Sequence, residues 1–176
     1  MQYFLGIDVG SSKTHALIAD EMGRCIGFGK AWGGNHQSAG YDGLENVLRE
    51  SFDGALKMSG VDKAHIAGAG FGAAGYDFPS DRASHLQTIA KLGLSCPAEV
   101  VNDGWNGLLA GATRGVGVNV TAGSSIIVAG EIRMEKRGAS LAMVPPLASM
   151  AAELRLPRKP FKLSIMRGSS VHRQPR

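Results

Sequence analysis

FLGIDVGSSKTHALIAD, residues 4–20, consists of two apolar runs joined by a Gly-Ser-Ser-Lys tip. Each run has the length and composition of a β-strand, so the stretch predicts a hairpin at the start of the chain. Asp8 lies inside the first apolar run, just before the tip at Gly10. A carboxylate beside a turn of small residues raises the question of whether this hairpin is only structural or holds a charged ligand.

The overall composition is that of a globular chain whose default is one domain. The chain has 176 residues, of which 44% are hydrophobic and 19% charged. No apolar run approaches the roughly 20 residues that a membrane-spanning helix needs. Cys25 and Cys96 lie far apart without a CxxC or Cys/His spacing, so neither a disulfide framework nor a zinc or iron–sulfur site is indicated. We therefore expect a cytoplasmic protein with no membrane partner.

The basic excess is confined to the end of the chain. Residues 1–130 contain 9 Lys and Arg against 12 Asp and Glu, whereas residues 131–176 contain 10 against 3, together with five of the seven prolines. Since the first 130 residues are slightly acidic, the net charge of +4 does not indicate a nucleic-acid partner. We expect residues 1–130 to form one lobe and residues 131–176 to be a basic, weakly ordered tail.

Periodicity and chain breakers predict alternating strands and helices before the tail. The predicted strands cover residues 3–9, 13–19, 24–32, 65–69, 98–101, 117–121 and 125–129, and the predicted helices cover 41–58, 80–92 and 105–113. The order is βββαβαβα followed by a second hairpin. Three antiparallel strands followed by right-handed crossovers predict an α/β fold, a ribonuclease-H-like lobe with a mixed five-stranded sheet flanked by helices.

The first hairpin tip is a candidate phosphate cradle. Gly10, Ser11 and Ser12 would expose consecutive backbone N–H groups with no bulky side chain in front of them, next to the cation of Lys13. Asp8 would face the same place and could hold Mg²⁺ through water, because magnesium keeps most of its hydration shell. The alternative is that the tip is a plain turn and Asp8 an edge residue.

A second stretch, GVGVNVTAGSSIIVAG at residues 115–130, repeats the pattern of strand, small-residue tip and strand. Its tip contains Ala122, Gly123 and Ser124, and two such hairpins can grip one phosphate chain from both sides. With GGNHQ and VVNDGWNGLLAG between them, the hairpins resemble the BadF/BcrA-type ATPases and N-acetylglucosamine kinases of the actin-like, sugar-kinase and heat-shock-ATPase superfamily. The resemblance covers residues 1 to about 130. It implies ATP and Mg²⁺ as cofactors, although the tip departs from the family's usual Gly-Thr-Gly-Ser by reading Thr-Ala-Gly-Ser.

The resemblance also assigns roles in a sugar site. It implies that Asp103, which follows an apolar strand, is the base for a sugar hydroxyl, and that Asn35, Asn102 and Gly75 contact the sugar. Phosphoryl transfer needs an oriented nucleophile relieved of its proton, which a fixed carboxylate provides. The alternatives are that Asp103 is only a helix N-cap and that Asn35 is a solvent-facing loop residue.

Gly70, Gly72 and Gly75 match the GxGxxG pattern of dinucleotide-binding folds. In those folds the helix opens directly on the glycine loop, so that its N-terminus meets the pyrophosphate. Residues 76–79, Tyr-Asp-Phe-Pro, intervene here, and the first strand pair is a hairpin. We therefore predict that this stretch is not a dinucleotide site. The family resemblance implies instead that it is a loop lining the substrate cleft.

The favoured function is ATP-dependent phosphorylation of a sugar such as N-acetylglucosamine, so the expected partner is a small sugar, with a homodimer left open. The alternative is an ATPase of the type that activates dehydratases and reductases, but those activators carry cluster-binding cysteines. The resembled kinases are about twice as long, with a second lobe that closes over ATP. We therefore expect residues 131–176 to replace that lobe in a truncated or frameshifted form whose own activity is in question.

Overall fold

The computed structural model of the chain describes residues 1–111, 117–122 and 126–131. The chain divides into two compact units, Met1–Asp103 and a second unit that begins at Gly104. The predicted tail lies outside the described residues apart from Glu131, so the predicted boundary near residue 130 stays a prediction.

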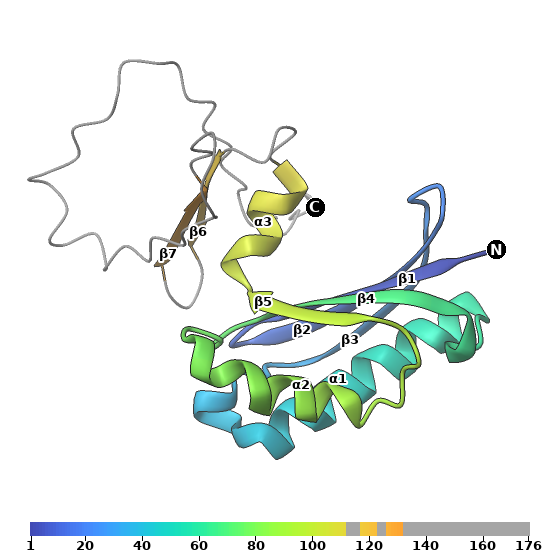
Figure 1. Cartoon of the computed structure of the whole chain (residues 1–176), viewed down its shortest axis with the longest axis horizontal. Coiled ribbons are helices and arrows are strands. Elements are labelled where there is room, and N and C mark those ends of the chain that lie inside the picture. The colour runs from blue at the N-terminus through green and yellow to red at the C-terminus, as the bar shows by residue number, and fades with distance from the viewer. Residues whose placement is uncertain (112–116, 123–125, 132–176) are drawn as a thin grey trace, which may run out of the picture. The chain divides into compact units, whose positions relative to one another are not determined.

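A mixed five-stranded sheet forms the centre of the first unit (Figure 1). Its strands are β1 (Tyr3–Val9), β2 (Lys13–Asp20), β3 (Cys25–Trp32), β4 (Ile66–Ala73) and β5 (Ala98–Asn102). They lie in the order β3-β2-β1-β4-β5. The pairs β1–β2 and β2–β3 are antiparallel, whereas β4 runs parallel to both β1 and β5. This arrangement confirms the predicted ribonuclease-H-like sheet.

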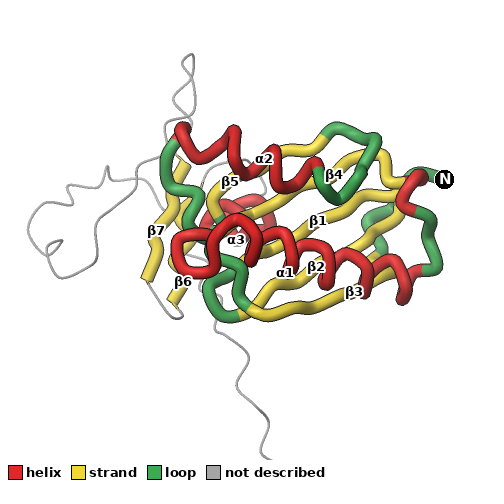
Figure 2. Tube along the Cα trace, turned by 90° about the horizontal axis from the view of Figure 1, so that it is seen from below, coloured by secondary structure: helices red, strands yellow, loops and turns green. Residues whose placement is uncertain are grey.

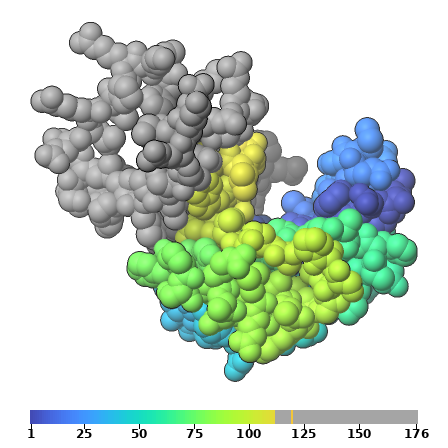
Figure 3. Space-filling view, viewed as in Figure 1, coloured from blue at the N-terminus to red at the C-terminus, as the bar shows by residue number. Residues whose placement is uncertain are grey.

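Both long helices of the first unit, α1 (His36–Ser59) and α2 (Arg82–Ala90), lie on the same face of the sheet (Figure 2). The two helices contact each other, and in the space-filling view the green residues of α2 lie in front of the blue-green residues of α1 (Figure 3). Each connects two strands, α1 between β3 and β4 and α2 between β4 and β5. Within residues 1–103, no helix lies on the other face of the sheet.

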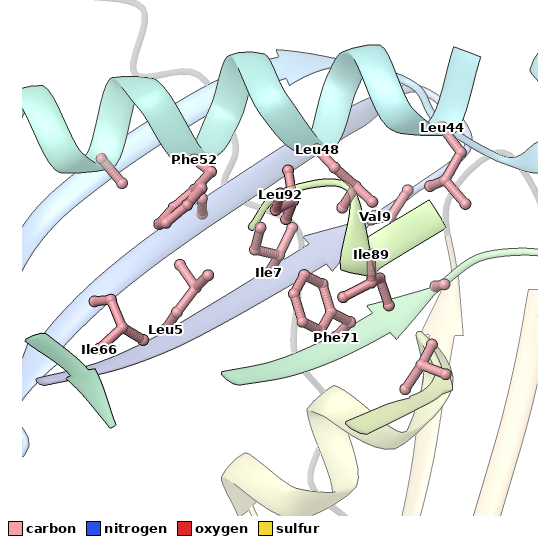
Figure 4. Close-up of a cluster of buried hydrophobic side chains, with 14 of the residues drawn as sticks. Leu5, Ile7, Val9, Leu44, Leu48, Phe52, Ile66, Phe71, Ile89 and Leu92 are labelled. Atoms are coloured by element: carbon pink, nitrogen blue, oxygen red, sulfur yellow. The ribbon is translucent and has the colours of Figure 1, made fainter. Parts of the chain in front are cut away.

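The core lies between the sheet and these two helices, and strand alternation selects its members. In β1, Leu5, Ile7 and Val9 are buried, whereas Phe4 and Asp8 on the other face are exposed. Figure 4 shows the inward side chains of β1 and β4 meeting those of α1 and α2. Aliphatic and aromatic side chains placed at every second strand position thus fix which face the helices cover.

The first helix packs closely on β3 because that strand carries glycine at two inward positions. A Cβ at Gly29 would overlap the carbonyl oxygen of Ser51, and one at Gly27 would lie 2.5 Å from the carbonyl oxygen of Ala55. From the helix side, a Cβ at Gly54 would lie 3.2 Å from the Cα of Gly29. Glycine therefore lets the two backbones approach to a distance that no side chain permits.

The regular part of α1 begins where the periodicity predicts, at Tyr41. Gly40, with φ 70° and ψ 173°, separates it from a short helical turn over residues 36–39, which the sequence analysis left as loop. The helix ends at Ser59, one residue beyond the predicted end at 58. Gly60 caps it, with φ 67° and its N–H donating to the carbonyl oxygen of Leu56.

Two predicted elements between α1 and β5 need correction. The strand predicted at 65–69 follows a 3₁₀ turn at Lys63–His65 and extends as β4 to Ala73, so Gly70 and Gly72 lie in a strand and not in a cleft-lining loop. The helix predicted at 80–92 consists of a 3₁₀ turn, Pro79–Asp81, followed by the shorter α2. Because no helix opens on the glycines, the rejection of a dinucleotide site stands.

The described part of the second unit consists of α3 (Gly104–Gly111), β6 (Gly117–Ala122) and β7 (Ile126–Glu131). The two strands form an antiparallel hairpin, as predicted. The buried side chain of Asn119 donates through Nδ2 to the carbonyl oxygen of Gly104 at 3.0 Å, and a Cβ at Gly107 would meet the same side chain. Asn119 therefore ties the start of α3 to β6.

Among the described residues, no helix combines the length and the apolar character needed to cross a membrane.

Candidate functional site

The site residues predicted in the first unit lie along one edge of the sheet. Because β1, β4 and β5 are parallel, their carboxyl ends lie at the same end of the sheet, and β3 ends and β2 begins there too. We call this row of strand ends the upper edge; it is not an edge strand. It carries these predicted residues: Asp8, Gly10, Ser11, Ser12, Lys13, Asn35, Gly75, Asn102 and Asp103. Loops at the carboxyl ends of parallel strands are where open α/β sheets bind ligands.

The first hairpin tip is tight and exposed. The N–H of Gly10 donates to the carbonyl oxygen of Lys13 at 2.9 Å, closing the turn. A Cβ at Gly10 would lie 2.9 Å from that same oxygen, so a larger residue would force the tip apart. Ser11, Ser12 and Lys13 are exposed, which is what a phosphate cradle requires.

The loop after β3 packs directly on this tip, a contact that the sequence analysis did not predict. A Cβ at Gly33 would overlap the backbone of Ser11. The N–H of Gly34 donates to the carbonyl oxygen of Gly10 at 3.1 Å, and Nδ2 of Asn35 lies 3.5 Å from Oγ of Ser11. The predicted phosphate tip therefore packs directly against residues 33–37, the loop that carries the predicted sugar contact Asn35 and that we call the sugar loop.

Asn35 and Gly75, predicted separately as sugar contacts, lie against each other. Oδ1 of Asn35 accepts a hydrogen bond from the N–H of Gln37 at 2.9 Å and so caps the short helical turn. Gly75 has φ 83°, and a Cβ there would overlap Oδ1 of Asn35. Glycine at this position is thus required by the backbone conformation and by the close approach of Asn35.

Asn102 and Asp103 occupy the end of β5. Asn102 is buried, and its Nδ2 donates to the carbonyl oxygen of Tyr76 at 3.0 Å and to Oδ1 of Asp77 at 3.1 Å. Asp103 follows at the end of the first unit and is half-buried. The predicted base therefore directly follows a side chain that is held in place by the turn after β4.

Asp8 is exposed on the face of the sheet that α1 and α2 do not cover, opposite His15 in the strand pair. In the described residues, no group of three or more His, Cys, Asp or Glu side chains is placed to hold a metal ion. A single carboxylate beside an exposed phosphate tip still fits Mg²⁺, which takes most of its ligands from water and phosphate oxygens.

An aromatic cluster that includes His36, the residue after Asn35, was not predicted from the sequence. The ring of His36 stacks on Tyr41 with centroids 4.8 Å apart and meets the edge of His85 at 4.7 Å. Tyr76 contacts His85 from another side at 5.3 Å. These residues come from three separate segments, so no local sequence pattern indicates the cluster.

His85 is the buried centre of this cluster. Its Nδ1 lies 2.8 Å from the carbonyl oxygen of Asp81, an acceptor, so Nδ1 carries the hydrogen. Burial lowers the pKa of His85, while the hydrogen bond to Asp81 acts in the opposite direction. Backbone N–H groups of Phe78 and Asp77 donate to the Asp81 carboxylate and lower its pKa.

The second predicted hairpin is described only in part. Ala122 ends β6, whereas Gly123 and Ser124 at its tip lie outside the described residues. The expectation that this tip faces Gly10 across one cleft therefore stays a prediction.

The two cysteines lie away from the upper edge. Cys25 begins β3, and Cys96 precedes the start of β5, so both lie toward the opposite edge of the sheet. Both are free thiols. Neither thiol is therefore close enough to the candidate site to bind an iron–sulfur cluster there.

The fold is that of sugar kinases and related ATPases with an actin-like architecture. Two solved structures assigned as N-acetylglucosamine kinases match, one from Porphyromonas gingivalis with a TM-score of 0.61 and 22% identity over 84% of this chain and 50% of its own. The other, from Chromobacterium violaceum, has a TM-score of 0.56 and 17% identity over 74% and 45%. A glucokinase of the ROK family from Streptomyces griseus, solved with glucose and AMPPNP, has a TM-score of 0.58 and 21% identity over 80% and 48%.

The chain belongs to the BadF/BadG/BcrA/BcrD ATPase family, whose model matches residues 5–142. This confirms the resemblance drawn from the hairpins and the loops between them. The chain spans about half the length of the solved structures named above. Comparison with curated protein sequences gave no significant match.

Proposed function

We propose that the chain takes part in ATP-dependent phosphoryl transfer to a sugar hydroxyl, with N-acetylglucosamine or a related hexose as acceptor. The observation that carries the proposal is the joining of three predicted sites along the upper edge: the tip at Gly10 and Ser11, the loop at Asn35, and the end of β5 at Asn102. The AMPPNP and glucose bound by the Streptomyces griseus glucokinase support this pair of ligands.

In this proposal Asp103 accepts the proton of the attacking sugar hydroxyl. A carboxylate fixed at the end of a strand can orient the hydroxyl and remove its proton as the new P–O bond forms. Nδ2 of Asn35 can donate to sugar hydroxyls, since Oδ1 is already engaged by Gln37. Asn102 and Gly75 complete the proposed sugar contacts.

The phosphates of ATP would lie on the tip formed by Gly10, Ser11 and Ser12, with Lys13 supplying positive charge. The second tip, with Ala122, Gly123 and Ser124, would contact them from the other side. Asp8 would hold Mg²⁺ through water, and the ion when bound would neutralise charge on the phosphate oxygens. Orientation of the sugar and removal of its hydroxyl proton would be carried out by the side chains named above.

The test is sugar-dependent ADP release by the purified chain. MgATP is supplied with N-acetylglucosamine or with glucose, and ADP and sugar phosphate are both quantified. We expect ADP release to rise with sugar and to equal the sugar phosphate formed. Asp103→Asn keeps the side-chain shape but cannot accept the proton, so release should fall by about 10²- to 10⁴-fold while nucleotide binding changes little.

Asp62→Asn is the matched control, because Asp62 precedes β4 at the opposite edge of the sheet and caps a 3₁₀ turn there. Its sugar-dependent ADP release should equal that of the original chain. If the chain hydrolyses ATP at a rate that no sugar changes, the kinase proposal is wrong and the activator-type ATPase replaces it. Near-normal turnover by Asp103→Asn would instead reject only the assigned base.

The matched kinases are about twice as long as this chain. Their full activity is therefore attributed to this chain only within the present proposal. The truncated form whose own activity is in question, the homodimer and the cytoplasmic location expected from the sequence stay predictions.

A further inference from the structure

Asp77, in the turn after β4, connects two segments that the sequence keeps far apart. Its Oδ2 accepts a hydrogen bond from Nε2 of Gln37, 40 positions away, at 3.0 Å. Its Oδ1 accepts one from Nδ2 of Asn102, 25 positions away, at 3.1 Å. One carboxylate therefore joins the short helical turn of the sugar loop to the end of β5.

Both donors are also held by other groups. The backbone N–H of Gln37 donates to Oδ1 of Asn35, and its Nε2 lies 3.5 Å from the carbonyl oxygen of Gly75. Nδ2 of Asn102 donates to the carbonyl oxygen of Tyr76 as well. A change at Asp77 should therefore reach Asn35 in one direction and the end of β5 in the other.

The turn that carries Asp77 is itself fixed. The backbone N–H groups of Asp77 and Phe78 both donate to Oδ2 of Asp81, at 3.1 and 2.9 Å. Asp81 ends the 3₁₀ turn and directly precedes α2, whose His85 is packed in the aromatic cluster. The carboxylate of Asp77 is thus presented from a rigid support and not from a free loop.

We propose that Asp77 is a positioning residue that sets the separation between Asn35 and the Asn102–Asp103 pair. The inference rests on the proposed sugar site, to which it adds a residue that binds no sugar itself. Sugar recognition needs the two sides of the site within a few tenths of an ångström of their working positions, and a bridge between them provides that.

The chemistry of the bridge explains why position 77 carries a carboxylate. Both neighbours donate, so both oxygens at position 77 must accept. In Asp77→Asn one acceptor becomes an NH₂ group. Asn102 cannot turn its amide to meet it without losing its bond to Tyr76, whereas Gln37 can turn and present Oε1, at the expense of its contact with Gly75.

This difference gives a test by exchange of donor and acceptor. Gln37→Glu alone places a second carboxylate opposite Asp77 and should break the bridge by repulsion. Combined with Asp77→Asn, the new Glu accepts from the new amide, and Asn102 still donates to the remaining oxygen. The double variant should therefore restore the hydrogen-bonded bridge that Gln37→Glu alone disrupts. Asp77→Ala removes both acceptors, and Asp62→Asn again serves as the matched control.

Two measurements on the full chain test separately whether the bridge forms and whether it contributes to sugar binding. The side-chain amide NMR signals of Gln37 and Asn102 report the bridge, and titrations with N-acetylglucosamine and glucose, followed at the backbone amides of Asn35 and Gly75, give the sugar affinity. We expect Asp77→Ala to shift both side-chain signals. Gln37→Glu removes the amide at position 37 and should shift the signal of Asn102. Both variants should weaken sugar binding by about tenfold or more. The double variant should return to within about threefold of the original affinity.

Unchanged sugar affinity in Asp77→Ala, with binding by the original chain intact, overturns the positioning role and leaves the proposed function standing. Failure of the double variant to recover affinity overturns it too. If the original chain shows the bridge signals but binds neither sugar, the proposed function is wrong, and the positioning role falls with it.

Discussion

The two faces of the five-stranded sheet differ in what they contain and in what covers them. The face under α1 and α2 is lined by aliphatic and aromatic side chains that are almost fully buried, such as Ile7, Val9 and Phe71. The other face carries Asp8 together with Phe4 and Phe28, whose exposed fractions are 43% and 41%. The candidate metal ligand thus lies on the face that contributes least to the packed core of the first unit.

The difference indicates a division of labour within each strand. Alternate positions of β1 serve stability and ligand binding, because successive side chains point to opposite faces. A carboxylate can occupy position 8 without disturbing the core, since its neighbours Ile7 and Val9 face the helices. This answers the question raised by the aspartate in the first apolar run.

The largest expected difference between the faces concerns a pair of phenylalanines. Phe52 of α1 is 2% exposed and packs against the sheet, whereas Phe28 of β3 lies on the other face. Phe52→Ala should lower the free energy of unfolding by about 3–5 kcal/mol through lost burial and a cavity. Phe28→Ala should lower it by about 1 kcal/mol or less. Urea unfolding followed by circular dichroism measures both, and equal losses would contradict the assignment of the core to the helical face.

A smaller effect is expected from His85, which packs on the helical side. Its pKa is lowered by burial, so the unfolded chain binds a proton more readily than the folded one. The stability that neutral, buried His85 contributes is fully present above its unfolded pKa of about 6.5. It is lost as the pH falls below that value, by at most about 1.4 kcal/mol per pH unit. Urea unfolding between pH 7.5 and pH 5.5, about one unit to either side of that value, measures this slope.

His36 and the Asp81 carboxylate both interact electrostatically with His85, so the slope must be assigned by substitution. His85→Asn keeps a donor for the carbonyl oxygen of Asp81 and removes the titrating ring, and it should flatten the slope. His65→Asn, at an exposed position before β4, should leave the slope unchanged. A slope that survives His85→Asn would show that another group causes it.

The smallest effect on stability is expected at Asp8. Because this side chain is exposed, Asp8→Asn should change the free energy of unfolding by no more than about 0.5 kcal/mol. The same variant should lose much of the gain in ATP affinity that Mg²⁺ gives. Calorimetric titration with ATP, with and without the ion, measures that gain. An equal gain in the variant and the original chain would remove Asp8 from the proposed metal site.

Most of the fold could be predicted because its signals are local. The alternation in β1 and β2, the spacing of Leu44, Leu48 and Phe52, and the stop at Gly60 each act within one element. The length of β4 could not, because after Ile66 the strand IAGAGFGA has no β-branched residue and consists mainly of glycine and alanine, which do not favour a strand. It is a strand because β1 and β5 supply hydrogen-bonding partners on both sides, which only the assembled sheet provides.

The candidate site divides in the same way. Asn35, Gly75 and Asn102 could be predicted because they lie in short motifs that resemble a known family. Gln37 and Asp77 could not, since each acts through contacts with residues 25 to 40 positions away. Gln37 ends the GGNHQ motif, but nothing in that motif indicates its contact with Asp77. The turn at residues 36–39 was missed because Gly40 interrupts the helical periodicity.

The contact between the loop after β3 and the hairpin tip should make the two ligands of the proposed site dependent on each other. Gly34 donates to the carbonyl oxygen of Gly10, so a phosphate that orders the tip also restricts the loop carrying Asn35. Part of the conformational entropy that the sugar would have to remove is then already gone. Linkage is reciprocal, and each ligand should raise the affinity for the other by the same factor.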